Sequence, residues 1–260
     1  MKVLEMAVLP QLSKLKLDQF ARRFRSESIP LGTSFSYFCA AMPLGEDDLK
    51  EYLEEPIAAL PPGISSRLPR ILICLVPYLE MAAVKSKKKN AGDQLVSMEK
   101  PAANKQVAVA HMADGGQMVL AFGIKDQELA DYHYHFYRSI ATLVADKLEP
   151  AEWQTYLDVI TAEFTAEAHG EVDESSWALK EELTSQDVKF SKTSKPCLDY
   201  SKQSLIDTLT LYLHGICCDI DVEPGPRQLR TSFLRKRLKL FKILFAPGEG
   251  FAVFPEDEKH

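Results

Sequence analysis

Three short segments hold residue types that could do chemistry. The first reads Asp-Tyr-His-Tyr-His-Phe-Tyr-Arg from Asp131 to Arg138, with His133 and His135 two positions apart. Side chains two positions apart on a helix point about 200° from each other, so these histidines cannot bind one metal ion from a straight helix. We expect aromatic packing and a hydrogen-bonded histidine in this segment.

The second segment places two carboxylates one helical turn apart. Glu163 and Glu167 lie at i and i+4, and His169 follows them. Paired carboxylates with a histidine can bind a divalent cation or transfer protons, but glutamate is also a common solvated helix former. We favour a solvated face, with no metal and no cofactor. If a metal binds this protein, the ligands to test first are His135, Glu163, Glu167 and His169.

The third segment contains His214, Cys217 and Cys218, which lie within one helical turn of each other. A histidine beside cysteines can activate a thiolate or bind a soft metal. Leucines and isoleucines surround these residues, and cysteine is among the most buried residue types. We therefore expect core packing rather than chemistry.

A hydrolase is the alternative that these segments leave open. A strand pair followed by a helix and then by carboxylate-rich helices looks like the layout of zinc metallopeptidases. Their His-Glu-x-x-His motif supplies two zinc ligands and a general base. The frame that starts at His135 reads His-Phe-Tyr-Arg-Ser, which lacks the base and the second ligand. The alternative function is a zincin-like scaffold that has lost this motif, or an unrecognised metal-dependent hydrolase.

The end of the chain carries the strongest charge asymmetry. Seven cations occur in residues 227–242, and no acidic residue lies between Glu223 and Glu249. Without these seven charges the formal net charge of −6 would be −13. An apolar stripe at i, i+4, i+7 and i+11 accompanies the cations, which is typical of a basic amphipathic helix. The stripe consists of Leu234, Leu238, Phe241 and Phe245.

Such a helix can contact an acidic protein, nucleic-acid phosphate or an anionic membrane surface, or it can dock on its own core with its charges in water. The acidic pI of about 5.6 argues against a general nucleic-acid binder, so we favour a protein partner with an acidic surface. The predicted partner-binding residues are Arg227, Arg230, Arg235, Lys236, Lys239 and Lys242.

Several enzyme classes lack their motifs. The chain has no Gly-x-Gly-x-x-Gly, no P-loop and no Gly-x-Ser-x-Gly, so dinucleotide, nucleotide and serine-hydrolase chemistry are not indicated. The favoured hypothesis is a non-enzymatic interaction or regulatory protein. Five cysteines without a Cys-x-x-Cys spacing, and no visible signal peptide or membrane-spanning stretch, predict the cytoplasm.

The expected elements make an α+β fold. Residues 70–76 form a short branched run between prolines, which predicts a buried strand. Residues 106–111 and 117–122 flank Asp-Gly-Gly and predict a β-hairpin. Helices are expected over 11–26, 47–60, 128–148, 153–169, 174–185, 203–217 and 228–245.

We predict one domain over 1–260, with a strand-containing part to about residue 125 and a helical part over 126–245. Its small antiparallel sheet is covered by helices. The Lys-rich stretch 85–105 is expected to be a mobile loop with a short strand near 94–98.

Overall fold

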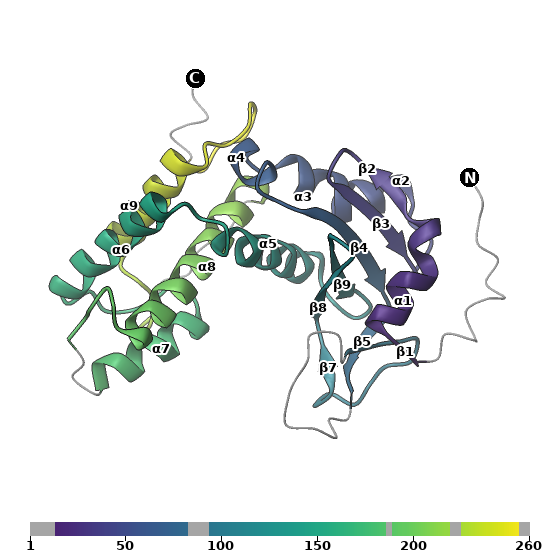
Figure 1. The fold of residues 1–260 in the computed structure, drawn as a ribbon, viewed down its shortest axis with the longest axis horizontal. Helices are drawn as coiled ribbons and strands as arrows, with labels where there is room; N and C mark the ends of the chain where they lie inside the picture. The colour runs from purple at the N-terminus through teal and green to yellow at the C-terminus, as the bar shows by residue number, and fades with distance from the viewer. Residues whose placement is uncertain (1–13, 83–93, 186–188, 219–224, 255–260) are drawn as a thin grey trace. The chain divides into compact units, whose positions relative to one another are not determined.

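The computed structural model describes residues 14–82, 94–185, 189–218 and 225–254 of the 260-residue chain. These residues cluster into two compact units, drawn in Figure 1. The sheet unit comprises Met1–Glu55 and Leu68–His135, and the helical unit comprises Pro56–Arg67 and Phe136–His260. The α+β class is confirmed. The expectation of one integrated domain stays a prediction.

The sheet unit contains two β-sheets and short helical segments. Its elements are β1 (Lys14–Lys16), α1 (Leu17–Phe24), the 3-10 turn η2 (Arg25–Glu27), β2 (Ile29–Leu31), β3 (Phe35–Cys39), α2 (Glu46–Leu49), the π-helical turn η3 (Lys50–Glu54), β4 (Arg70–Val76), β5 (Tyr78–Met81), β6 (Gln94–Ser97), β7 (Gln106–Val107), β8 (Val109–Asp114) and β9 (Gln117–Gly123). The strand order is β2-β3-β4-β9-β8 in one sheet and β1-β6-β5-β7 in the other.

The predicted hairpin and buried strand are confirmed. Strands β8 and β9 pair in antiparallel register, with Asp114 opposite Gln117. Gly115 and Gly116 between them both have positive φ angles, of 59° and 83°, which a two-residue hairpin turn of this kind requires. Strand β4 is buried from its second residue to its last. Pro77, which has no N–H to donate, separates β4 from β5 in the other sheet.

The expected antiparallel pairing is found throughout the smaller sheet but not at the centre of the larger one. Strand β4 pairs in parallel with both β3 and β9, and only the outer strands β2 and β8 are antiparallel. An apolar run without alternation, buried on both faces, is typical of a parallel strand. One face of the larger sheet packs on α1. Phe20 and Phe24 of this helix form an aromatic cluster with Phe38 of β3.

Two local predictions need correction or lie partly outside the described residues. The helix expected over 11–26 begins only at Leu17, because residues 14–16 pair as a strand with β6. Residues 85–93 of the expected mobile loop lie outside the described residues. The remainder forms the predicted short strand, β6, and a turn in which Lys100 binds Asp126 at 2.9 Å.

The helical unit consists mainly of helices. Its elements are α3 (Glu55–Ala58, from its second residue on), α4 (Pro62–Ser65), α5 (Leu129–Ala145, from Phe136 on), α6 (Pro150–Thr165), α7 (Glu174–Ser185), α8 (Lys195–Cys217) and α9 (Thr231–Leu244). Arg67 ties the short N-terminal piece to α6 through two hydrogen bonds to Glu152, of 2.6 and 2.7 Å. Within the described residues, no helix is long and apolar enough to cross a bilayer.

Candidate functional site

The aromatic segment at the start of α5 is held by backbone carbonyls. Tyr132 donates a hydrogen bond to the carbonyl of Tyr52 at 2.7 Å, and Nε2 of His133 lies 2.9 Å from the carbonyl of Glu51. A carbonyl only accepts, so His133 must carry its proton on Nε2. Both side chains are buried, as the packing interpretation predicts.

Pro56 explains why these carbonyls need partners from elsewhere. In the π-helical turn η3, the N–H of Glu55 bonds to the carbonyl of Lys50. The next donor would be residue 56, but proline has no N–H. An N–H at position 56 would serve the carbonyl of Glu51 in the π register or that of Tyr52 in the α register, and proline can serve neither. His133 and Tyr132 bond to these two carbonyls instead. His133 therefore has a structural role, which is its hydrogen bond to the carbonyl of Glu51.

The second candidate segment separates at the end of α6. Glu163 is buried and both of its oxygens accept hydrogen bonds from Arg237. Glu167 is exposed, with a positive φ of 49°, and the exposed His169 packs its ring edge-on against Trp177. Within the described part of the helical unit, these three residues do not converge as a group of metal ligands.

His135, the fourth candidate ligand, is half-buried on α5 in the sheet unit. The metal hypothesis for His135, Glu163, Glu167 and His169 stays a prediction. For Glu163 to take part, it would have to release Arg237, whose Nε–H has no other bond partner among the residues that the structure describes. The third segment places His214 against Tyr137, with ring centroids 5.7 Å apart.

Helix α9 has two different faces. Its inward face buries Phe241 and Phe245 completely, while Leu234 and Leu238 of the predicted stripe are only half-buried. The opposite face exposes Lys236 and Lys239 together with Arg235. Ile243 lies on this outward face and is 79% exposed. On a helix, positions 236, 239 and 243 share one side, so the isoleucine stands among cations.

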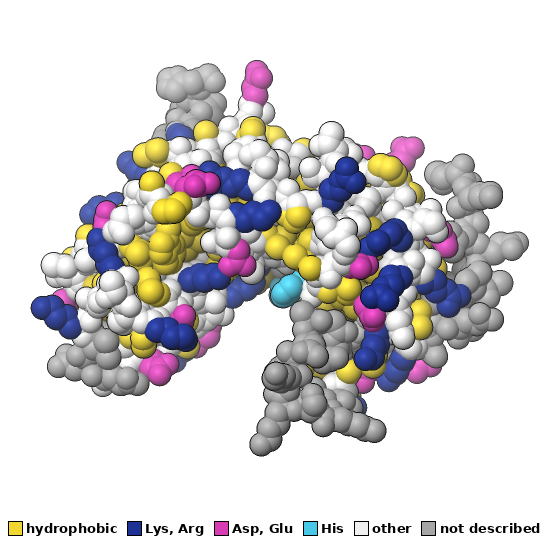
Figure 2. All heavy atoms as spheres, viewed as in Figure 1, with side chains coloured by type: hydrophobic (Ala, Val, Ile, Leu, Met, Phe, Trp, Pro, Cys, Tyr) yellow, Lys and Arg dark blue, Asp and Glu magenta, His cyan; other side chains and the backbone are white. Residues whose placement is uncertain are grey.

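The predicted partner-binding residues differ in how they are engaged. Arg227 binds Glu174 at 3.0 Å, and Arg230 is exposed just before α9. Arg235 and the half-buried Lys242 both lie over the ring of Phe254, at 4.9 and 5.9 Å from its centroid. In the view of Figure 2, Lys and Arg side chains lie among apolar side chains over the region of α6 and α9.

Arg237 is the member of the basic run for which the sequence analysis predicted no role. It was counted among the seven cations but not among the predicted partner-binding residues, and it has no exposed surface. Its position three residues after Leu234 and four before Phe241 puts it on the inward side of α9. That spacing was the available signal, although charge normally argues for the outer face.

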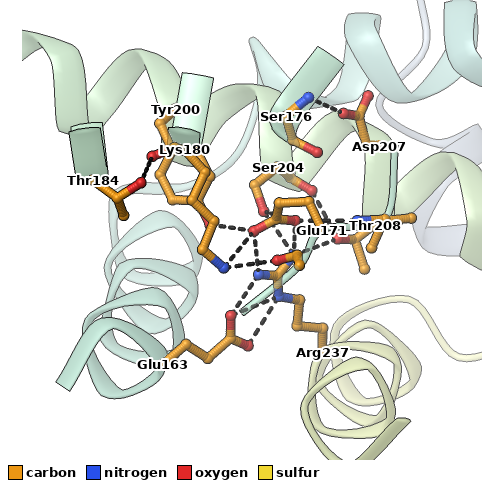
Figure 3. A network of polar contacts seen from close by, with 12 residues as sticks. Glu163, Glu171, Ser176, Lys180, Thr184, Tyr200, Ser204, Asp207, Thr208 and Arg237 are labelled. Carbon is orange, nitrogen blue, oxygen red and sulfur yellow. Dashed lines mark hydrogen bonds and ion pairs between the residues drawn. The ribbon is translucent and has the colours of Figure 1, made fainter. Parts of the chain in front are cut away.

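A polar network in the helical unit surrounds Arg237 (Figure 3). Its guanidinium donates from Nε and Nη2 to Glu163, and from Nη1 and Nη2 to Glu171 at 2.8 and 2.9 Å. The remaining Nη1 proton reaches the hydroxyl of Ser204 at 2.7 Å. All five guanidinium donors therefore have acceptors.

The network balances its charges. Lys180, also buried, binds the carbonyl of Gly170 at 2.8 Å and Glu171 at 3.4 Å. Two cations thus face two carboxylates, Glu163 and Glu171. Burial alone would raise the pKa of Glu171, but the charge of Arg237, with Lys180 and a hydrogen bond from Tyr200, lowers it to about 2. Burial lowers the pKa of Lys180, and Glu171 opposes that shift.

The same network fixes the start of α9. The N–H of Glu171 donates to the carbonyl of Arg227, and the N–H of Leu229 donates back to the carbonyl of Glu171. Gly170 has a φ of 86°, and a Cβ there would lie 2.2 Å from the carbonyl oxygen of Gln228. The inward face of α9 is therefore locked to α6, α7 and α8. Lys236, Lys239 and Ile243 on its outward face take no part in these hydrogen bonds.

Comparison with known proteins adds no assignment: no family model, no curated protein and no solved structure matches the chain.

Proposed function

We propose that this protein is a non-enzymatic interaction or regulatory protein that binds the acidic surface of a protein partner through the outward face of α9. The observation that carries the proposal is the 79% exposure of Ile243 beside the exposed Lys236 and Lys239. Covering a large apolar side chain that is exposed to water gains about 25 cal/mol per Å2 of buried surface.

The arrangement has the composition of a small binding epitope. An apolar anchor ringed by charges can supply affinity at its centre and orientation at its rim. Arg235, with its guanidinium over Phe254, extends the cationic side of the helix. The buried Arg237 network supports the proposal indirectly, because a rigidly held helix loses little conformational freedom when a partner docks.

The cytoplasm is the proposed location, since five cysteines without a disulfide-type spacing suit a reducing compartment. The competing proposal is the metal-dependent hydrolase or zincin-like scaffold around His135 and His169.

Site-specific photo-crosslinking tests the proposal most directly. A photo-reactive residue at position 243 should capture one partner, whereas the same residue at Lys195, an exposed position on α8, should not. The captured protein is then purified and its binding measured with the full chain. Capture of the same proteins from both positions would contradict the proposal.

Charge reversal then tests whether binding depends on the cationic face of α9 or only on the net charge of the protein. The double variant Lys236→Glu/Lys239→Glu should slow association strongly at low salt and less at high salt, because the Debye length falls from about 30 Å at 0.01 M to about 3 Å at 1 M. The matched control, Lys195→Glu/Lys202→Glu, makes the same charge change on α8 and should bind like wild type. Equal effects of the two double variants would contradict a specific basic face.

A stability control keeps folding and binding apart. Phe241→Ala removes a fully buried ring and should cost on the order of 3–5 kcal/mol at any salt concentration. The charge-reversed variant should melt like wild type, because exposed substitutions typically shift stability by about 0.5 kcal/mol or less. A charge-reversed protein that unfolds would mean that these lysines serve the fold.

A further inference from the structure

An open polar depression lies in the sheet unit, at the edge where the parallel strands β3, β4 and β9 begin. Its volume is about 610 Å3. The parallel registers bring the starts of these strands together, with Phe35 opposite Ile71 and Arg70 opposite Gln117. The lining residues are Arg25, Pro30, Gly32, Thr33, Ser34, Phe35, Ser36, Arg70, Gly115, Gly116 and Gln117.

The charge of this lining is wholly positive. Two arginines, Arg25 and Arg70, belong to it, and none of the residues that line it is acidic. Asp114 binds one Nη2 proton of Arg25 at 2.5 Å and thereby holds that guanidinium beside the hairpin turn. An arginine has five N–H donors in a planar fork, so most donors of Arg25 remain for a ligand. Arg70 is exposed at the first position of β4.

Two glycine turns line the same depression. Gly32 in the β2–β3 turn has a φ of 74°, and Gly115 and Gly116 in the β8–β9 turn are also left-handed. No described residue accepts a hydrogen bond from the N–H groups of these three glycines. A Cβ at Gly32 or Gly116 would meet nothing within 4 Å, so open space lies beside both turns. Successive N–H groups in turns form anion-binding concavities.

We propose that this depression binds a phosphate monoester group. Arginine forks match the geometry of phosphate oxygens, and turn N–H groups and the hydroxyls of Thr33, Ser34 and Ser36 add neutral donors. A carboxylate ligand would use fewer of these donors than a tetrahedral phosphate with three terminal oxygens. The site is independent of the α9 surface, so either proposal can fail without the other.

The test is a titration of the 15N-labelled full chain with inorganic phosphate at constant ionic strength, followed by amide chemical shifts. The N–H signals of Gly32, Gly115 and Gly116 should shift and saturate along one binding curve. Gly45 and Gly63 lie outside the depression and should not move. Shifts that rise linearly without saturation, or that chloride reproduces at the same ionic strength, would overturn the site.

Two arginine variants make the test specific. Arg70→Gln should weaken phosphate binding about tenfold or more, the loss expected for charge-assisted hydrogen bonds. Arg22→Gln removes the same charge from an exposed position of α1 and should bind like wild type. Melting curves verify that both variants are folded. Equal affinity of folded Arg70→Gln and wild type would overturn the assignment.

A parallel titration identifies the source of the phosphate. Glycerol 3-phosphate represents a small ester, and a phosphoserine peptide represents a modified protein. Saturable binding of either one, lost in Arg70→Gln, supports the proposal, and the tighter ligand shows which source the site suits. Failure of both ligands to compete with inorganic phosphate would contradict a monoester site.

Discussion

Replacement of Arg237 by leucine should destabilise the helical unit severely. The guanidinium has no exposed surface and donates to Glu163, Glu171 and Ser204. Arg237→Leu removes all five donors at once. It leaves two buried carboxylates with Lys180 as the nearest cation of the network. The cost is therefore the penalty of an uncompensated buried charge, beyond the loss of the hydrogen bonds themselves.

The expected loss is about 3–5 kcal/mol, the range for removing one partner of a buried ion pair. Native domains are stable by only about 5–15 kcal/mol, so the variant should unfold at a much lower urea concentration than wild type. Arg237→Lys keeps the charge but loses the fork that bridges Glu163 and Glu171, and its stability should fall between the two.

Urea unfolding followed by circular dichroism measures these differences. Lys239→Leu, two residues along on the exposed face, is the control and should change stability by about 0.5 kcal/mol or less. A quadruple leucine variant at Glu163, Glu171, Lys180 and Arg237 should regain much of the lost stability, because no unpaired buried charge remains. A cost below about 1 kcal/mol for Arg237→Leu would refute the reasoning.

Three further predictions concern pH, backbone geometry and metal. The pKa of Glu171 is about 2 in the fold and 4.5 ordinarily. The free energy of unfolding should therefore fall by roughly 3 kcal/mol as the pH drops from about 4.5 to 2. Urea unfolding at a series of pH values should show this loss for wild type and not for Glu171→Gln. Gly170→Ala should lower the melting temperature strongly, because its Cβ would lie 2.2 Å from a carbonyl oxygen. Gly215→Ala, with open space around its Cβ, is the control and should be neutral or slightly stabilising. Equal melting temperatures of the two variants would contradict this prediction. Mass-spectrometric metal analysis of the purified protein should find no stoichiometric zinc; one equivalent, lost on mutation of His135 or His169, would favour the hydrolase alternative.

Local patterns predicted the elements whose partners are close in sequence. The Asp-Gly-Gly turn specified the β8–β9 hairpin, because only two residues separate the paired strands. The limits predicted for α7, residues 174–185, agree with the helix observed. The pairing of β4 with β3 and β9 was not predictable in this way. Long connections separate the three strands, and the apolar run of β4 is compatible with any buried neighbouring strand.

The candidate surface was predictable in part. The period of 3.6 residues and the run of cations indicated that α9 is amphipathic and basic, and the exposure of Lys236 and Lys239 follows that pattern. The sequence also shows an isoleucine at position 243, but not that it is left exposed. Exposure depends on which elements pack beside that position, and only the packed structure decides this.

Arg237 marks the limit of what sequence alone determines. A helical period assigns residues to faces, but it does not decide whether a charged residue beside an apolar stripe is buried. Whether an arginine there turns inward depends on carboxylates from elsewhere, and Glu163 and Glu171 lie 74 and 66 residues away in the chain. A charge can be buried only where opposite charges and hydrogen-bond acceptors surround it. That convergence is a property of the tertiary structure, because distant segments supply every acceptor that the guanidinium needs.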